Sequence, residues 1–128
     1  PDVSLMDATK AIAMFQKLEV PILGVVENMS YFVCPCCNTR TEIFSHGGGK
    51  AAAERLKVPF LGEIPLYTSI REGGDTGTPV LVSAPASAEA DAFRNFAQNT
   101  AARLSVLQSI RAAEAAKGPR QFIKFFDS

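Results

Sequence analysis

The chain of 128 residues lacks an excess of charge of either sign, and it lacks a long apolar run. Thirteen basic residues balance thirteen acidic ones, so no basic face is offered to phosphates and we expect no nucleic-acid partner. No apolar run reaches the roughly 18 residues that suggest a membrane span. From its opening residues we expect neither a signal peptide nor a membrane partner. Because 47% of the residues are hydrophobic, the sequence is typical of one globular domain with a buried core.

Cysteine is scarce, and all three cysteines, Cys34, Cys36 and Cys37, lie in one short stretch. An odd, clustered set argues against a secreted disulfide scaffold. It favours a reducing compartment in which thiolates stay available to metal. We therefore expect the cytoplasm or an organelle matrix, that of the mitochondrion or the plastid.

The spacing of Cys34 and Cys37 is that of half a metal site. Two thiolates from one tight turn can bind the same ion or cluster, and Pro35 fixes φ in that turn. A zinc or iron-sulfur centre normally takes four ligands, and downstream the chain offers only His46. The simplest completion is a second copy, which predicts a homodimer bridged through the cysteine motif. The residues alone leave zinc and iron-sulfur chemistry both open.

Apolar patterning predicts an α/β protein with two buried parallel strands. The expected elements are a helix over residues 3–18, a strand over 22–26, a helix over 50–56, a strand over 58–64 stopped by Pro65, a short helix over 68–72, a turn over 73–79, an extended segment over 80–82 and a helix from Ser87 to about Ala116. Glu27 and Asn28 follow the first strand, at the carboxyl edge where open α/β sheets bind ligands. Two strands are too few for such helices, so we interpret residues 1–117 as the carboxyl-terminal half of a larger domain, with an apolar and basic tail over 118–128.

Several blocks of sequence, in one order, resemble a known family. They are Asp2 to Asp7, Val20-Pro21-Ile22-Leu23-Gly24, Glu27-Asn28-Met29-Ser30, Cys34-Pro35-Cys36-Cys37, Ile43-Phe44 with Gly47-Gly48-Gly49, Leu61-Gly62-Glu63-Ile64-Pro65-Leu66 and Gly74-Asp75-Thr76-Gly77-Thr78-Pro79. Together they resemble the carboxyl-terminal half of the Mrp/ApbC iron-sulfur carriers, which belong to the MinD/ParA class of P-loop ATPases. The resemblance implies the second half of a three-layer fold with a mostly parallel sheet.

The resemblance also implies a function and site residues. Family members are dimers that hold a labile [4Fe-4S] cluster on two cysteines per subunit, here Cys34 and Cys37, and pass it to apo-proteins. Asn28 and the loop Pro65-Leu66-Tyr67 correspond to adenine contacts. The Walker A loop and the Mg²⁺-binding residues would precede Pro1, so ATP and Mg²⁺ belong to the intact parent. This half should not hydrolyse ATP alone, and we assign it no catalytic residue. Cys36 departs from the two-cysteine pattern.

Alternative interpretations attach to several of these residues. Gly49-Lys50 is not a P-loop, because the pattern needs Gly at 44 and Ser or Thr at 51. His46 with its glycines lacks the nucleophile elbow of an esterase and is interpreted as a turn residue. Asn28 could be a simple turn residue and Asp75 a backbone cap. The tail suggests an amphipathic anchor, so the alternatives are a membrane-associated positioning ATPase of the MinD/ParA type and a structural zinc-bridged dimer.

Overall fold

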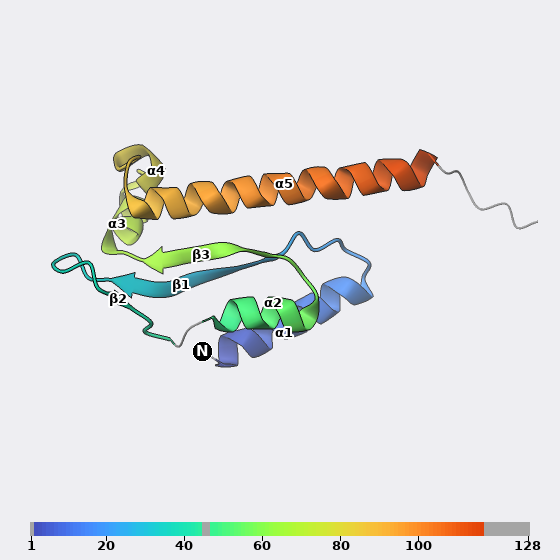
Figure 1. Ribbon diagram of the computed structural model, residues 1–128, viewed down its shortest axis with the longest axis horizontal. Coiled ribbons are helices and arrows are strands. Elements are labelled where there is room, and N and C mark those ends of the chain that lie inside the picture. Colours follow the sequence, from blue (N-terminus) through green and yellow to red (C-terminus); the bar gives the residue numbers. More distant parts are fainter. Residues whose placement is uncertain (1, 45–46, 117–128) are drawn as a thin grey trace, which may run out of the picture.

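The chain forms three layers: a pair of helices, a small sheet and one long helix (Figure 1). The computed structural model describes residues 2–44 and 47–116. Its elements in chain order are α1 (Asp2–Lys17), β1 (Val25–Val33), β2 (Arg40–Thr41), α2 (Gly48–Leu56), β3 (Phe60–Leu66), α3 (Thr68–Thr76), α4 (Val80–Ser83) and α5 (Ala88–Ala116). The three-layer α/β fold expected from the sequence is confirmed. The expected tail and His46 lie outside the described residues.

The sheet has the strand order β2-β1-β3. β1 and β3 run parallel, with Asn28 opposite Ile64. β2 is antiparallel and pairs only with the last two residues of β1, Phe32 and Val33. Within residues 2–44 and 47–116, no strand pairs with the earlier part of β1 on this side, so most of that edge is open.

A bulge divides β1 at Met29. This residue adopts a left-handed φ of 54°, and the pairing with β3 shifts between Asn28 and Phe32. The backbone N–H of Met29 donates to the side-chain Oδ1 of Asn28 at 3.0 Å, a local bond that supports the bend. The sequence prediction that this strand ends before Glu27 is wrong, because Glu27 and Asn28 pair with Glu63 and Ile64 of β3 and the strand continues to Val33.

Three other predicted boundaries are also wrong. Pro65 lies inside β3 instead of ending it, at an edge of the described sheet, where strands tolerate proline. Gly73 belongs to α3, which continues to Thr76 before Gly77 ends it at a φ of 72°. Residues 80–83 form the helical turn α4 after Pro79, whose carbonyl accepts from two of their backbone N–H groups.

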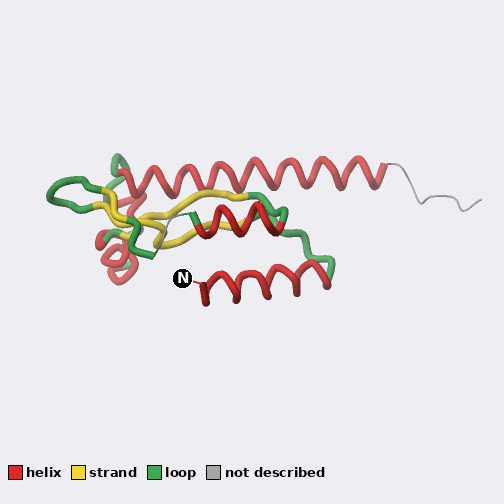
Figure 2. The backbone as a smooth tube through the Cα atoms, turned by 60° about the horizontal axis from the view of Figure 1, so that its bottom comes forward, coloured by secondary structure: helices red, strands yellow, loops and turns green. Residues whose placement is uncertain are grey.

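Helices cover both faces of the sheet. α1 and α2 lie on one face and α5 lies on the other (Figures 1 and 2). The predicted cap of α5 is confirmed, because the N–H of Ala90 donates to Ser87 Oγ at 3.2 Å. Side chains from every layer form the buried apolar core: Ile12, Ala52, Ala53, Leu61, Ile64, Val80 and Ala90.

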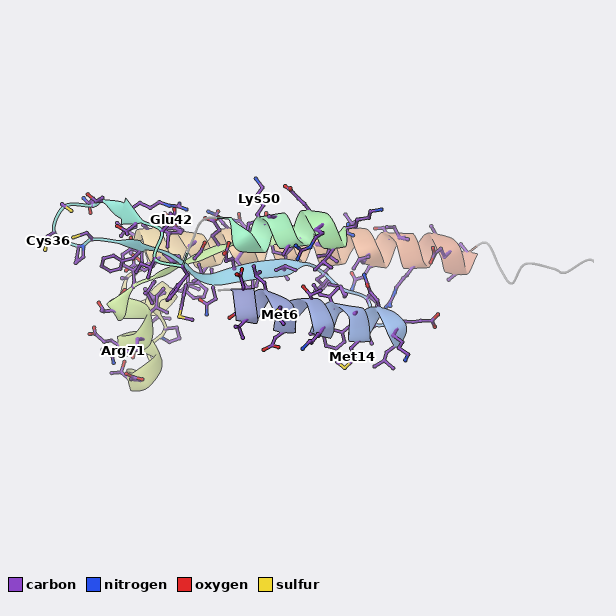
Figure 3. The ribbon with its side chains drawn as sticks, turned by 90° about the horizontal axis from the view of Figure 1, so that it is seen from below. Met6, Met14, Cys36, Glu42, Lys50 and Arg71 are labelled. Atoms are coloured by element: carbon purple, nitrogen blue, oxygen red, sulfur yellow. The ribbon has the colours of Figure 1, made fainter. Side chains whose placement is uncertain are left out.

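One side of α1 leaves large apolar side chains uncovered. Val3 is 70% exposed, and Leu18, directly after the helix, is 64% exposed. Met6 and Met14 also point away from the sheet (Figure 3). No helix in the described residues combines the length and the apolar character of a membrane span.

Candidate functional site

The cysteine loop, residues 34–39, closes the hairpin between β1 and β2. Two backbone hydrogen bonds hold it: the N–H of Cys34 donates to the carbonyl of Thr39 at 3.0 Å, and the N–H of Asn38 donates to the carbonyl of Cys34 at 2.8 Å. Asn38 has a φ of 57°, which asparagine adopts more readily than most residues. The loop projects beyond the sheet, with Cys36 near its tip (Figure 3).

The three thiols of this loop are free and differ in exposure. Cys34 is half-buried, whereas Cys36 and Cys37 are exposed. A hydrogen bond with the hydroxyl of Thr39 is the main cause that lowers the pKa of the Cys37 thiol, and bonds to the Thr39 backbone and to the Cys34 side chain add to it. This hydrogen bonding therefore favours the thiolate, the reactive and metal-binding form of cysteine, at the exposed end of the loop.

One chain does not complete a metal site in its described part. Residues 2–44 and 47–116 contain no group of three or more His, Cys, Asp or Glu side chains placed to hold a metal ion. What they offer is the loop with Cys34 and Cys37 at the outer end of a hairpin. The donor set suits a thiolate-bound metal centre whose remaining ligands come from elsewhere.

Arg40 anchors the base of the cysteine loop, and sequence reasoning did not identify it. Its guanidinium stacks on the ring of Tyr31, with Cζ 3.7 Å from the ring centroid. Its Nε donates to Glu42 Oε1 at 2.5 Å and its Nη2 donates to Glu63 Oε2 at 3.3 Å. In the sequence, the contacts of Arg40 are indicated only by the opposite charge of Glu42 two positions later.

Asn28 borders a cavity of about 260 Å³ beside β1. Residues from the first turn of α1, from β1 and from the start of α2 line it, among them Asp2, Leu5, Glu27, Asn28, Ser30 and Gly49. Ser30 is 4% exposed, and its Oγ has no hydrogen-bond partner within the described chain. The cavity could therefore accommodate a small polar group.

The start of α2 does not suit a phosphate. A Cβ built at Gly49 would lie 3.1 Å from Glu27 Oε2, so the Glu27 carboxylate lies against the first turn of this helix. A negative charge in that place is stabilised by the helix dipole and repels an anion. Lys50 is exposed and its side chain extends away from the sheet (Figure 3).

The other predicted nucleotide residues lie at the carboxyl end of β3. Pro65 is buried, while Leu66 and Tyr67 are half-buried. Burial is the main cause that raises the pKa of the Tyr67 hydroxyl, and the negative charge of Glu89 adds to it. Although β1 and β3 are neighbours, these three residues do not line the cavity beside Asn28.

Asp75 is not the backbone cap suggested by the sequence. It lies in α3 and accepts a hydrogen bond from Arg71 Nη1 at 2.6 Å, one helical turn away. Its side chain is 64% exposed, so this ion pair is a surface feature of α3.

The fold and the loop together define a class of protein. Parallel strands between layers of helices are the architecture of nucleotide-binding α/β domains, and the projecting hairpin adds a group of free thiols. A family model described as the NUBPL iron-transfer P-loop NTPase, of the ParA group, matches residues 1–101. The chain belongs to this family.

Curated relatives agree with the family match. The chain is 50% identical over 107 residues to an iron-sulfur protein of Arabidopsis thaliana required for NADH dehydrogenase and named as mitochondrial, covering 84% of this chain and 34% of that protein. It is 47% identical over 103 residues to the iron-sulfur cluster transfer protein NUBPL of Mus musculus, covering 80% and 32%. It is 45% identical over 103 residues to the iron-sulfur cluster carrier protein of Escherichia coli, covering 80% and 28%. The chain thus spans about a third of the length of these relatives.

Two solved structures share the fold. A nucleotide-binding protein from Archaeoglobus fulgidus, described in complex with ADP and with cobalt, is 38% identical at a TM-score of 0.50, covering 55% of this chain and 29% of that one. The cell division ATPase MinD of Pyrococcus furiosus is 28% identical at a TM-score of 0.55, covering 74% and 36%. The predicted P-loop NTPase fold is therefore confirmed.

Proposed function

We propose that this chain is the cluster-binding part of an iron-sulfur cluster carrier. It would bind a labile [4Fe-4S] cluster as cargo and deliver it to apo-proteins. The observation that carries the proposal is the cysteine loop, a projecting hairpin end that presents Cys34 and Cys37 as half of a four-thiolate site. Family membership supports iron-sulfur chemistry over zinc, because the relatives are named as cluster carriers and cluster transfer proteins.

A homodimer supplies the missing ligands in this account. Two thiolates from each of two copies make the four that a cubane cluster takes. A hairpin end is suited to such a meeting because it projects beyond the sheet (Figure 3). Cys36 lies in the same turn, but four ligands are reached without it.

Exposure of the loop supports transfer rather than permanent storage. Cys37 is exposed and Cys34 only half-buried, so an incoming thiolate can reach the irons and exchange with a ligand. Thiolate attack of this kind depends on access as well as on pKa. A structural zinc site would have the opposite requirement, because it is closed to exchange.

The nucleotide-binding role we propose is partial. Asn28 and the segment Pro65-Leu66-Tyr67 would contact the adenine end of ATP. The start of α2 does not suit its phosphates, because the Glu27 carboxylate lies against it. Mg²⁺ and hydrolysis would depend on polypeptide outside this chain. We expect the protein to act in a reducing compartment, the mitochondrial matrix or the cytoplasm, without nucleic acid or a membrane as partner.

Cluster reconstitution tests the proposal. The protein that carries this chain is incubated anaerobically with iron and sulfide, and its iron, sulfide and visible absorption are measured. We expect a broad brown chromophore and about one [4Fe-4S] cluster per two chains. Cys34→Ser and Cys37→Ser should each abolish loading, whereas Cys36→Ser should load nearly as well as wild type. Tightly held zinc without iron in the protein as purified would contradict the proposal.

A further inference from the structure

Arg40 connects all three strands at the base of the cysteine loop. It lies on β2, it stacks on Tyr31 of β1 with 3.7 Å between Cζ and the ring centroid, and it forms an ion pair with Glu63 of β3 at 3.3 Å. It forms a second ion pair with Glu42, the residue directly after β2, with 2.5 Å between Arg40 Nε and Glu42 Oε1. A single side chain therefore joins three strands at the point where the loop leaves the sheet.

The backbone alone holds this loop weakly. β2 has two residues, and its ladder consists of the pairs Phe32 with Thr41 and Val33 with Arg40. Isolated two-stranded pairings of this length are marginal in water. The Arg40 to Glu63 contact spans 23 positions of sequence and ties the hairpin to β3, with which β2 has no ladder.

We propose that Arg40 is a positioning residue for the cluster: its clamp on Tyr31 and Glu63 fixes the direction in which the hairpin presents Cys34 and Cys37. The inference rests on the proposed function, since it names the residue that prepares the same site. Two hairpins that meet across a two-fold axis must both point correctly, so a small change of direction at the base is doubled at the shared site.

Arginine suits this task better than lysine. Its planar guanidinium stacks on the tyrosine ring and still directs separate N–H groups at two carboxylates, whereas an ammonium is a compact point charge without a stacking face. Because lysine keeps the positive charge but not the stacking plane, Arg40→Lys should hold the cluster better than Arg40→Ala and less well than wild type. Arg71 is a matched control, because it also makes two ion pairs, with Glu72 and Asp75, but both lie within α3, away from the loop (Figure 3).

The first measurement is the rate at which a ferrous chelator removes iron from the cluster-loaded protein. Arg40→Ala should accelerate the loss about fivefold, the order expected from one stacked cation and two partly exposed ion pairs. Arg71→Ala should stay near the wild-type rate, and Arg40→Lys should fall between. Glu63→Gln should accelerate the loss in wild type and add little in the Arg40→Ala background, because the two residues act as one unit.

The second measurement does not need a cluster. A nitroxide label is attached to Cys36 in a Cys34→Ser/Cys37→Ser background, and its mobility is read by electron paramagnetic resonance in the apo-protein. Arg40→Ala should make the label more mobile, and Arg71→Ala should leave its spectrum unchanged.

The two measurements test the positioning role of Arg40 separately from the proposed function as a cluster carrier. A mobile label in Arg40→Ala together with a wild-type protein that never loads a cluster supports the clamp and overturns the proposed function. A loaded wild type in which Arg40→Ala behaves like Arg71→Ala overturns the clamp. Faster cluster loss without a more mobile label, or a more mobile label without faster loss, also overturns the positioning role.

Discussion

The thiol sulfur of Cys37 lies 3.2 Å from the hydroxyl oxygen of Thr39, two residues further along the cysteine loop. While Cys37 is protonated, its S–H donates to this oxygen. When the thiol ionises, the hydroxyl can rotate and donate to the thiolate, which lowers the pKa of Cys37. The loop therefore favours the metal-binding form of one of its two proposed ligands before any metal arrives.

We predict that Thr39→Val raises the pKa of Cys37. In the apo-protein, alkylation of Cys37 by iodoacetamide should then require a higher pH, because only the thiolate reacts. Mass spectrometry of peptides across a series of pH values measures the change, with Cys36 in the same molecules as the internal control. An unchanged pH profile for Cys37 would show that Thr39 does not stabilise its thiolate.

Two adjacent glycines of α3 should respond to alanine in opposite ways. A Cβ at Gly73 would lie 2.6 Å from the backbone carbonyl oxygen of Thr78, which cannot move freely. Gly73→Ala should lower the free energy of unfolding by about 1–3 kcal/mol. Gly74 has nothing within 4 Å of such a Cβ, so Gly74→Ala should raise it by about 0.5–1 kcal/mol through helix propensity. Urea unfolding of both variants compares them, and equal effects would contradict this packing.

One asparagine of the long helix α5 forms a hydrogen bond to the sheet. Asn99 Nδ2 donates to the backbone carbonyl of Leu61 in β3 at 2.9 Å. Asn99→Ala should cost about 1 kcal/mol of unfolding free energy, since it leaves this carbonyl without its partner. Asn95→Ala, one turn earlier on an exposed position of the same helix, is the control and should be neutral or slightly stabilising. Equal stability of the two variants in thermal unfolding would contradict a stabilising role for the hydrogen bond from Asn99 to Leu61.

Lys50 should have no part in ATP hydrolysis. It is exposed in α2, whose first turn is occupied by the Glu27 carboxylate. We expect residues 1–128 alone to show no Mg²⁺-dependent release of phosphate above background. In a longer protein that hydrolyses ATP, Lys50→Ala should leave the rate unchanged. A colorimetric phosphate assay tests both, and turnover by the isolated chain that is lost in Lys50→Ala would contradict the assignment.

The two long helices α1 and α5 were predictable because their signals are local, and the interpretation of Cys34 and Cys37 as metal ligands stays a prediction. Periodic apolar residues gave α1 and α5 to within a residue or two, Ser87 marked the cap of α5, and spacing alone singled out Cys34 and Cys37. The uncovered apolar side of α1 and the open edge of β1 match the interpretation of the chain as part of a larger domain, which remains a prediction.

Other features depend on contacts that spacing does not reveal. The bulge at Met29 lets β1 continue past Asn28, and β3 holds Pro65 inside a strand because that strand lies at the edge of the described sheet. The clamp of Arg40 depends on Glu63, a residue 23 positions away that only the parallel pairing of β1 with β3 brings near. The proposed adenine contacts stay untested, since Asn28 and residues 65–67 do not share one cavity.

The mass of the cluster-loaded species shows whether two chains share one cluster. If each chain supplies Cys34 and Cys37 to a shared centre, native mass spectrometry should find a dimer whose extra mass equals about one [4Fe-4S] cluster. The dimer should return to monomer when a chelator strips the iron. Cys37→Ser should remain monomeric and colourless under the same conditions, while Cys36→Ser should behave as wild type. A Cys37→Ser monomer that carries a complete cluster would contradict the account.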